Sequence, residues 1–280
     1  GSARRDYANN GRRIRRDYTD AFPSAHLTYD VTRALKARLS WSTSFGRAQP
    51  SNLLPNETPN ETAQTLTINN PGLKPQYARE WDAALEYYFE PVGSLSVSWF
   101  RKRIRDYIIT GTNVGTVPSG NDNGFNGEYS GFTLLSSSNA GTATVNGWEF
   151  AYQQQFTFLP GLLKGLGAAL NYTLLEASGN FGGATNRSTN QVPGFIPRTA
   201  NATLSWRYRK FSTRVLYNHV GSYITSYNAA TPGYSAYRFA YRTVNLGVTW
   251  QLRPSVQLTA DVSNLFNAPQ RTYRGFTDRM

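Results

Sequence analysis

The chain has 280 residues, a formal net charge of +12 and no cysteine. Charged residues make up only 16% of the chain although aromatic residues reach 14%, whereas about a quarter of the residues of a soluble domain are charged. The apolar runs fall well short of the roughly 20 residues that a transmembrane helix needs, which excludes a helical membrane protein. The lack of cysteine excludes disulfides and thiolate metal sites.

Basic residues are spread along the chain, with one concentration at its beginning. Six arginines stand close together there: Arg4, Arg5, Arg12, Arg13, Arg15 and Arg16. No recognised nucleic-acid-binding motif accompanies them, so we expect no nucleic-acid partner. The opening segment is predicted to be a solvated loop or a loop that faces anionic lipid headgroups.

Ten segments alternate apolar with small or polar residues, which is the two-residue period of a strand with two different faces. They span residues 22–31, 35–42, 80–89, 94–107, 148–158, 166–174, 199–208, 211–218, 243–252 and 255–263. In the segment 243–252, for example, Val244, Leu246, Val248 and Trp250 share one face. The pattern predicts ten long strands.

The segment 94–107 departs from this regularity. Its apolar residues change parity at Phe100 and Ile104. The other parity then holds Arg101, Arg103 and Arg105. We expect a bulge near Trp99 and Phe100, because one extra residue in a strand reverses the faces that follow it.

The connections between these segments alternate short and long. Five are tight, at residues 32–34, 90–93, 159–164, 209–210 and 253–254. The others run for about thirty residues from Gly46, nearly forty from Ile108, about twenty from Glu176 and nearly twenty from Gly221. Outer-membrane barrels have this layout, with short turns in the periplasm and long loops outside the cell.

Strand length supports the same interpretation, because a tilted membrane strand needs about 9–11 residues while strands of soluble sheets have a mode of about 5–6. The sequence therefore predicts an all-β, antiparallel transmembrane β-barrel segment of about ten long strands in the outer membrane of a bacterium. Its partners there would be outer-membrane lipid and lipopolysaccharide. Aromatic residues near the strand ends suit the interfacial girdles of such a barrel, although a soluble sheet could bury them in a core.

Catalytic groups are sparse. The two histidines, His26 and His219, are far apart in the sequence and are expected on opposite faces of the sheet. Neither a Ser-His-Asp arrangement nor a metal-spaced histidine pair is evident, so we predict no enzyme activity, no catalytic or metal-binding residue and no cofactor. The inward-facing charges are expected to pair across neighbouring strands.

Ligand recognition would fall to the long loops. The most aromatic loop cluster consists of Tyr223, Tyr227, Tyr234, Tyr237 and Arg238. Aromatic and arginine anchors are common in binding surfaces, but tyrosines are also common at membrane interfaces. The cluster therefore assigns no individual ligand-binding residue.

Several segments resemble the barrel of TonB-dependent receptors. They are FPSAHLTYDVT at 22–32, NPGLKPQ at 70–76 with EWD at 80–82, the strand with Phe100, Ile104, Asp106, Tyr107 and Ile108, NGWE at 146–149 and VSNLFN at 262–267. Their order and spacing cover most of the chain. The resemblance implies part of a 22-stranded barrel of an outer-membrane active transporter, which takes up a siderophore, haem, cobalamin or carbohydrate ligand and is energised by the TonB complex.

The same resemblance implies parts that the sequence does not contain, namely a plug domain, a TonB box and a last strand after Asn267. Residues 1–280 would then form a partial receptor barrel whose two ends both lie outside the cell. Its further partners would be the plug domain, the remaining barrel strands, the TonB complex and a small-molecule ligand. The alternatives are a passive porin-like channel and a surface adhesin or other soluble β-protein.

Overall fold

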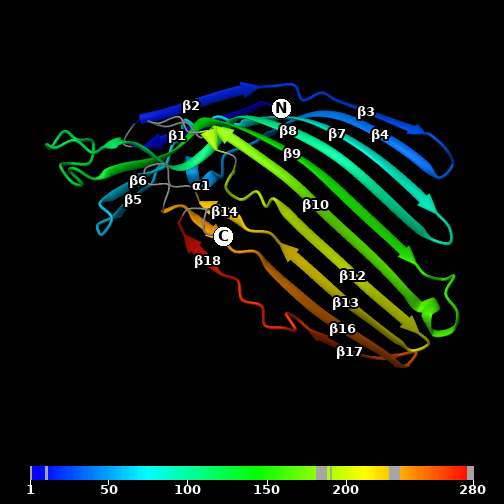
Figure 1. Ribbon diagram of the computed structural model, residues 1–280. Coiled ribbons are helices and arrows are strands. Elements are labelled where there is room, and N and C mark those ends of the chain that lie inside the picture. The colour runs from blue at the N-terminus through cyan, green and yellow to red at the C-terminus, as the bar shows by residue number, and fades with distance from the viewer. Residues whose placement is uncertain (1, 10–11, 181–187, 190, 227–233, 276–280) are drawn as a thin grey trace.

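The computed structural model describes residues 2–9, 12–180, 188–189, 191–226 and 234–275. One large curved sheet dominates it, with ten strands that neighbour each other in chain order and are all antiparallel (Figure 1). These strands are β3 (Ser24–Asp30), β4 (Leu35–Gly46), β7 (Gln76–Phe89), β8 (Gly93–Thr116), β9 (Thr133–Gln155), β10 (Leu166–Asn180), β12 (Arg198–Tyr208), β13 (Phe211–Val220), β16 (Tyr241–Arg253) and β17 (Val256–Val262). The ten predicted strands are thus confirmed in number and order.

Smaller elements occupy the end of the sheet where the long connections lie. They are β1 (Ser2–Asn9), β2 (Arg12–Thr19), α1 (Pro50–Leu53), β5 (Glu57–Asn60), β6 (Thr65–Ile68), β11 (Ser188–Thr189), β14 (Tyr223–Ser226), β15 (Ala236–Arg238) and β18 (Thr272–Arg274), and a short helix η1 (Gly161–Gly165) lies at the opposite end. We call the two ends of the sheet the loop end and the turn end (Figure 1). Neither helix in the described segments is long and apolar enough to cross a bilayer.

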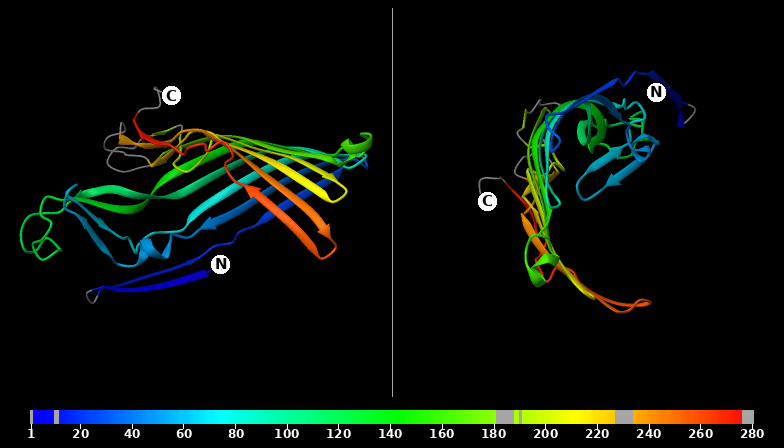
Figure 2. Two further views of the ribbon diagram at one scale, coloured as in Figure 1. Left: turned by 90° about the horizontal axis from the view of Figure 1, so that it is seen from below. Right: turned by 90° about the vertical axis from the view of Figure 1, so that its right-hand side faces the viewer.

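The sheet is open. Seen along its strands it forms an arc, with β3 and β17 at its two edges (Figure 2). No ladder joins these edge strands to each other within the described residues, and every residue of both strands is exposed. The backbone groups on the outer side of each edge strand therefore have no partner strand in this part of the chain.

The two faces of the arc differ in chemistry because alternate side chains of a strand point to opposite sides. Apolar side chains cover the convex face and remain between 44% and 52% exposed at their centres, as at Leu39, Leu85, Leu170, Leu204 and Leu258. The alternate, mainly polar side chains point into the concave side. An apolar face of this extent on a soluble monomer would be an interaction surface, so it requires a partner or a lipid environment.

The predicted bulge near Trp99 and Phe100 is wrong. The ladders of β8 with β7 and with β9 run without interruption through Arg105. The first irregularity of the β8–β9 ladder comes at Asp106, whose φ is +55°. Phe100 and Ile104 therefore lie on the concave face, and the arginines that alternate with them lie on the convex face.

Two predicted loops are partly strands. The connection expected to run for nearly forty residues from Ile108 is shortened by β8, which continues to Thr116, and by β9, which begins at Thr133. The opening segment, expected to be a loop, contains the hairpin of β1 and β2, which pairs Ser2 with Thr19. Both extend beyond the sheet at the loop end, where pairing with a neighbour satisfies backbone groups that a bare loop would leave to water.

The segment 47–75 is tied to β9 by asparagine side chains. Asn139 Nδ2 donates to the carbonyls of Lys74 and Asp106 at 2.9 Å each, while its Oδ1 accepts from the backbone N–H of Lys74 at 2.7 Å. Asn70 Nδ2 donates to the Ser137 carbonyl at 2.9 Å. These bonds give the NPGLKPQ segment a structural role, which is to fix the long loop against a neighbouring strand.

The turn end contains one glycine that tolerates no side chain. A Cβ on Gly165 would lie 1.7 Å from the carbonyl oxygen of Arg207, a backbone atom that cannot swing away. We expect Gly165→Ala to lower the free energy of unfolding by about 2–3 kcal/mol, since overpacking commonly costs about 1–3 kcal/mol. Urea unfolding of the refolded protein would measure the loss. Leu162→Ala in the same turn, at a side chain 54% exposed, should change it by less than about 1 kcal/mol.

Candidate functional site

Charged side chains on the concave face pair between neighbouring strands. Arg38 Nε lies 2.9 Å from Glu86 Oε1, and Lys102 Nζ lies 2.9 Å from Glu80 Oε2. Each pair joins β7 to an adjacent strand. Ion pairs with this much solvent contact contribute about 0–1 kcal/mol each, so their role is to order the wall.

The pairing of charges on the concave face is incomplete, although Lys36 Nζ lies 3.1 Å from Asp30 Oδ1 at the β3 edge. Arg214 lies 3.5 Å from Asp261, and both side chains are more than half exposed. Glu149 and Arg207 belong to the inward-facing charges for which the alternation predicts pairing, but they form no ion pair with any residue that the structure describes. The concave wall therefore offers both charge signs to whatever fills the arc.

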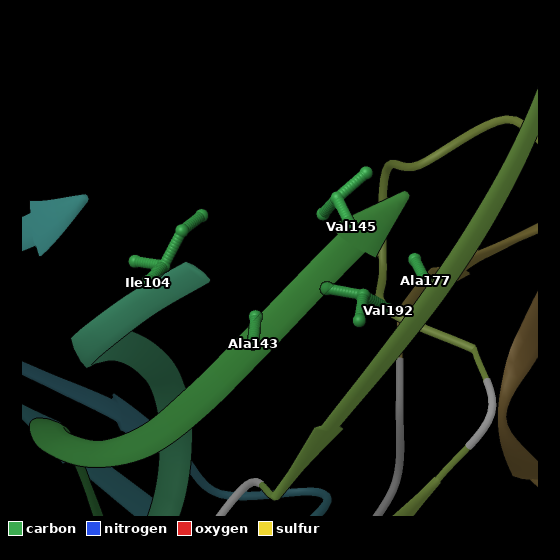
Figure 3. Packing of buried hydrophobic residues seen from close by; sticks show 5 residues of the cluster. All are labelled: Ile104, Ala143, Val145, Ala177 and Val192. Atoms are coloured by element: carbon green, nitrogen blue, oxygen red, sulfur yellow. The ribbon is translucent and has the colours of Figure 1, made fainter. Parts of the chain in front are cut away.

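An apolar cluster interrupts this polar wall near the loop end. It consists of Ile104 from β8, Ala143 and Val145 from β9, Ala177 from β10 and Val192 from the connection after β10 (Figure 3). All five side chains are buried. The change of parity in β8 thus places an apolar side chain inside the arc, where it packs against a loop.

A slot of about 480 Å³ opens beside this cluster. The ladder of β10 with β12 ends at Leu174 opposite Arg198, so β10 extends past its neighbour and leaves room next to it. Gln191, Phe195 and Tyr223 are among the side chains that line the slot. It is large enough for a ring system or a few polar groups of a ligand, and it combines aromatic and amide chemistry, as small-molecule sites do.

The segment 191–197 that covers the cluster is held at both sides. The backbone N–H of Leu175 donates to the Pro197 carbonyl at 2.8 Å, and the N–H of Gly194 donates to the Ile224 carbonyl at 3.0 Å. Phe195, partly buried, packs against the apolar cluster from this segment. The aromatic ring is therefore fixed between β10 and β14.

The structure separates the predicted tyrosine cluster into different roles. Tyr223 lines the slot and stands opposite Arg238 in the β14–β15 ladder. Tyr234 is 66% exposed. Tyr227 lies outside the described residues. Only Tyr223 of the described tyrosines in this set lines the slot.

Tyr237 is a packing residue. Its ring stacks on Tyr273 of β18 with 5.2 Å between centroids, and Phe239 lies 4.4 Å from the same ring. Burial, and then the neighbouring Tyr237, raise the pKa of Tyr273 above its usual value, so this phenol stays protonated at neutral pH. The small sheet of β14, β15 and β18 is therefore held together by rings at the loop end.

The histidines occupy separate strands and opposite faces. His26 lies on the concave face of β3, opposite Ser40, and His219 lies on the convex face of β13, opposite Ala200. Groups of three or more His, Cys, Asp or Glu side chains able to hold a metal ion do not occur among the described residues. The slot and the apolar cluster are thus the strongest candidate site, and the chemistry they offer is binding.

Sequence reasoning missed the residues that build this site. Val192 and Phe195 lie in a connection without alternation, and the expected bulge near Phe100 would have turned Ile104 to the opposite face. The sequence of β8 did contain an indication of this site. Its apolar residues Phe100 and Ile104 have the parity of the concave face, and they begin where the convex face of the strand stops being apolar. Read as a continuous strand, that change of parity would have placed Ile104 inside the arc.

The sequence matches the family described as "TonB dependent receptor-like, beta-barrel" over residues 1–265. The chain belongs to this family. Its ten strands, long loops and short turns correspond to part of the β-barrel of this family. No curated protein matches the chain.

Solved TonB-dependent receptors share the fold at low sequence identity. A variant of the ferric enterobactin receptor of Pseudomonas aeruginosa aligns with a TM-score of 0.64 and 18% identity, over 90% of this chain and 35% of the receptor. The ferric yersiniabactin uptake receptor of Yersinia pestis gives 0.62 and 16%, over 94% and 37%. The iron transporter FrpB of Neisseria meningitidis gives 0.60 and 16%, over 93% and 37%. The chain thus spans little more than a third of the length of these receptors.

Proposed function

We propose that this chain forms part of an outer-membrane receptor that imports a small ligand with energy from the TonB complex. Family membership carries the proposal, and the structure adds a concave wall with an apolar cluster and a slot near the loop end. The solved relatives are a ferric enterobactin receptor, a ferric yersiniabactin uptake receptor, an iron transporter and a copper transporter. A ferric siderophore is therefore the first ligand class to test, followed by haem, cobalamin and carbohydrates.

The remaining partners follow from the same proposal. The convex apolar face would lie in outer-membrane lipid, and the mixed charges of the concave wall would face a plug domain or water in the lumen. Further strands would pair with the open edges at β3 and β17. Because the chain spans about 35% of the first receptors it matches, those strands and the plug would come from the rest of a longer receptor.

Energised uptake separates the proposed receptor from a passive porin. Cells that lack their own siderophore receptors would express the full-length receptor and receive radioactive ferric siderophores, haem or cobalamin. We expect one of these ligands to accumulate only when the TonB gene is intact. Equal uptake with and without TonB would instead establish a passive channel.

The slot gives a residue-level prediction. We expect Phe195→Ala to weaken binding of the imported ligand about 30-fold, which corresponds to about 2 kcal/mol for an aromatic side chain in contact with the ligand. Titration of the purified receptor with the ligand identified by uptake would measure this. Phe195→Leu, which keeps an apolar side chain over the cluster, should retain part of the affinity. Phe239→Ala, outside the slot, should leave binding unchanged, and an equal effect of both alanine variants would argue against the slot.

A further inference from the structure

The convex face carries a group of arginines just above its apolar belt, toward the loop end. Arg79 projects from β7, and Arg101, Arg103 and Arg105 project from β8. The ladder places Arg79 directly opposite Arg103. We call these four residues the arginine cluster.

The position of the cluster along the strands corresponds to the outer edge of a membrane. Arg79 lies ten residues from Phe89, the last residue of β7 at the turn end. Ten residues span roughly 33 Å along a strand, or about 25 Å across a membrane at a tilt of about 40°, which equals the apolar band of an outer-membrane barrel. The guanidinium groups would therefore stand at the level of the lipid headgroups.

Tryptophans mark the same boundary. Trp41 and Trp81 are opposite each other in the ladder of β4 with β7, and Trp99 and Trp148 are opposite each other in the ladder of β8 with β9. All four share the convex parity of the apolar belt. Tryptophan prefers the interface between hydrocarbon and water, so the arginines that follow it toward the loop end lie in the polar zone.

No carboxylate of the described residues forms an ion pair with the arginine cluster. The buried Nε of Arg101 has no hydrogen-bond partner among the same residues. Arg105 instead lies over the ring of Tyr77, 5.1 Å from its centroid. Like charges opposite each other destabilise a sheet, so the pair of Arg79 and Arg103 favours binding of an external anion.

Two carboxylates limit the cluster at its borders. Asp20 Oδ2 accepts a hydrogen bond from Tyr77 Oη at 2.7 Å, and Glu176 lies on the same face of β10, two strands away from Arg101. With four arginines on β7 and β8 against these two carboxylates, the surface between them keeps a net positive charge. An anionic partner is therefore favoured over a cationic or neutral one.

The cluster borders a groove of about 370 Å³. Arg79, Arg103 and Arg105 line it together with the hydroxyl-bearing side chains of Thr43 and Thr144. Guanidinium groups bind phosphate through two parallel hydrogen bonds, and hydroxyl groups can donate further ones. The groove thus combines the donors that a phosphate group requires.

One wall of this groove is aromatic. Phe22 stacks on Phe45 with 4.6 Å between ring centroids, and the Tyr77 ring lies 6.3 Å from the Phe22 ring. A soluble anion would gain nothing from these rings. A lipid whose phosphate lies in the groove could place its apolar part against them and against the belt below.

We propose that the arginine cluster and its groove bind the phosphorylated headgroup of lipopolysaccharide in the outer leaflet. This inference rests on the outer-membrane location proposed above, and it assigns a lipid site to the wall of the barrel that shares no lining residue with the ligand slot beside β10. The bound phosphates would neutralise the arginines and hold the loop-end parts of β7 and β8 at the membrane surface.

The test compares two triple variants of the full-length receptor in detergent. Arg79→Gln, Arg103→Gln and Arg105→Gln remove three charges at the proposed site. Arg33→Gln, Arg209→Gln and Arg253→Gln remove the same charge at the turn end. We expect at least a tenfold loss of affinity for purified lipopolysaccharide in the first variant and less than a twofold change in the second.

Three controls decide the interpretation. Lipid from which the phosphates have been removed should bind the unaltered receptor at least tenfold more weakly, and millimolar inorganic phosphate should not displace lipopolysaccharide. Heat-modifiable migration shows that each variant is folded, and the single change Arg103→Gln replaces the triple variant if that one does not fold. Equal losses in both triple variants, or unchanged binding in the first, would overturn the proposal. TonB-dependent uptake measured on the same variants reports on the receptor function separately.

Discussion

The substitution Leu85→Arg is expected to lower the free energy of unfolding by about 3 kcal/mol, because an arginine near the midplane of an outer-membrane barrel costs about 2–4 kcal/mol. Leu85 lies on the convex face of β7, four residues from Trp81 and four from Phe89, which places it in the middle of the apolar belt. Its side chain is 47% exposed. On a soluble protein, a change at such a surface position would usually stay within about 0.5 kcal/mol.

Leu54→Arg provides the matched control. Leu54 is 56% exposed and follows α1 at the loop end, so it gains the same charge outside the proposed membrane. Urea unfolding in lipid vesicles would measure both variants. A large loss for Leu85→Arg with little change for Leu54→Arg is the outcome of a membrane barrel, whereas small and equal changes would favour a soluble sheet or adhesin.

The fold could be predicted to this extent because a wall between two different environments imposes a strict period. Each strand must present one kind of side chain to each side, and each tight turn must return the chain in register. The ten strands and the short turns, such as Thr32 with its side chain accepting from the N–H groups of Ala34 and Leu35, follow from that constraint. Local patterns are sufficient where the environment is uniform.

The same reasoning failed in β8 because the environment changes along that strand. Between the turn end and Trp99, the convex face of β8 is apolar. Between Trp99 and the loop end, arginines occupy that face. Ile104 is apolar on the concave side because Ala143 and Val192 pack against it there. Sequence reasoning assumed that each face of β8 keeps one polarity along the whole strand. That assumption required a bulge at Phe100, and the structure has none there.

The candidate site was even less accessible to sequence reasoning. The residues that form this site are far apart in the sequence: Val192 packs in the same cluster as Ile104 of β8. Composition drew attention to Tyr237, which is buried against Tyr273 of a distant strand. Tyrosine-rich loops thus predict where rings gather, but only the tertiary arrangement separates a packing ring from one that lines a slot.

Paired cysteines should show that β3 and β17 are not neighbours in the assembled receptor. The chain has no cysteine, so Leu27→Cys in β3 can be combined in turn with Leu258→Cys, Ala260→Cys or Val262→Cys in β17. Closure of the ten strands on themselves would bring facing Cα atoms to about 4.5–5.5 Å, within the limit of about 7 Å for a disulfide. We expect no intramolecular disulfide, as judged by migration without reductant after mild oxidation.

The control for this experiment is a pair of strands known to be adjacent. Leu204 of β12 stands opposite Val215 of β13 on the convex face, so Leu204→Cys with Val215→Cys should cross-link readily. A disulfide in any β3–β17 combination at a similar yield would establish a closed ten-stranded barrel and contradict the proposed partial barrel. The negative result is expected because each unpaired backbone group in lipid costs several kcal/mol. Two exposed edges of seven residues each can lie in a membrane only when further strands of the receptor pair with them.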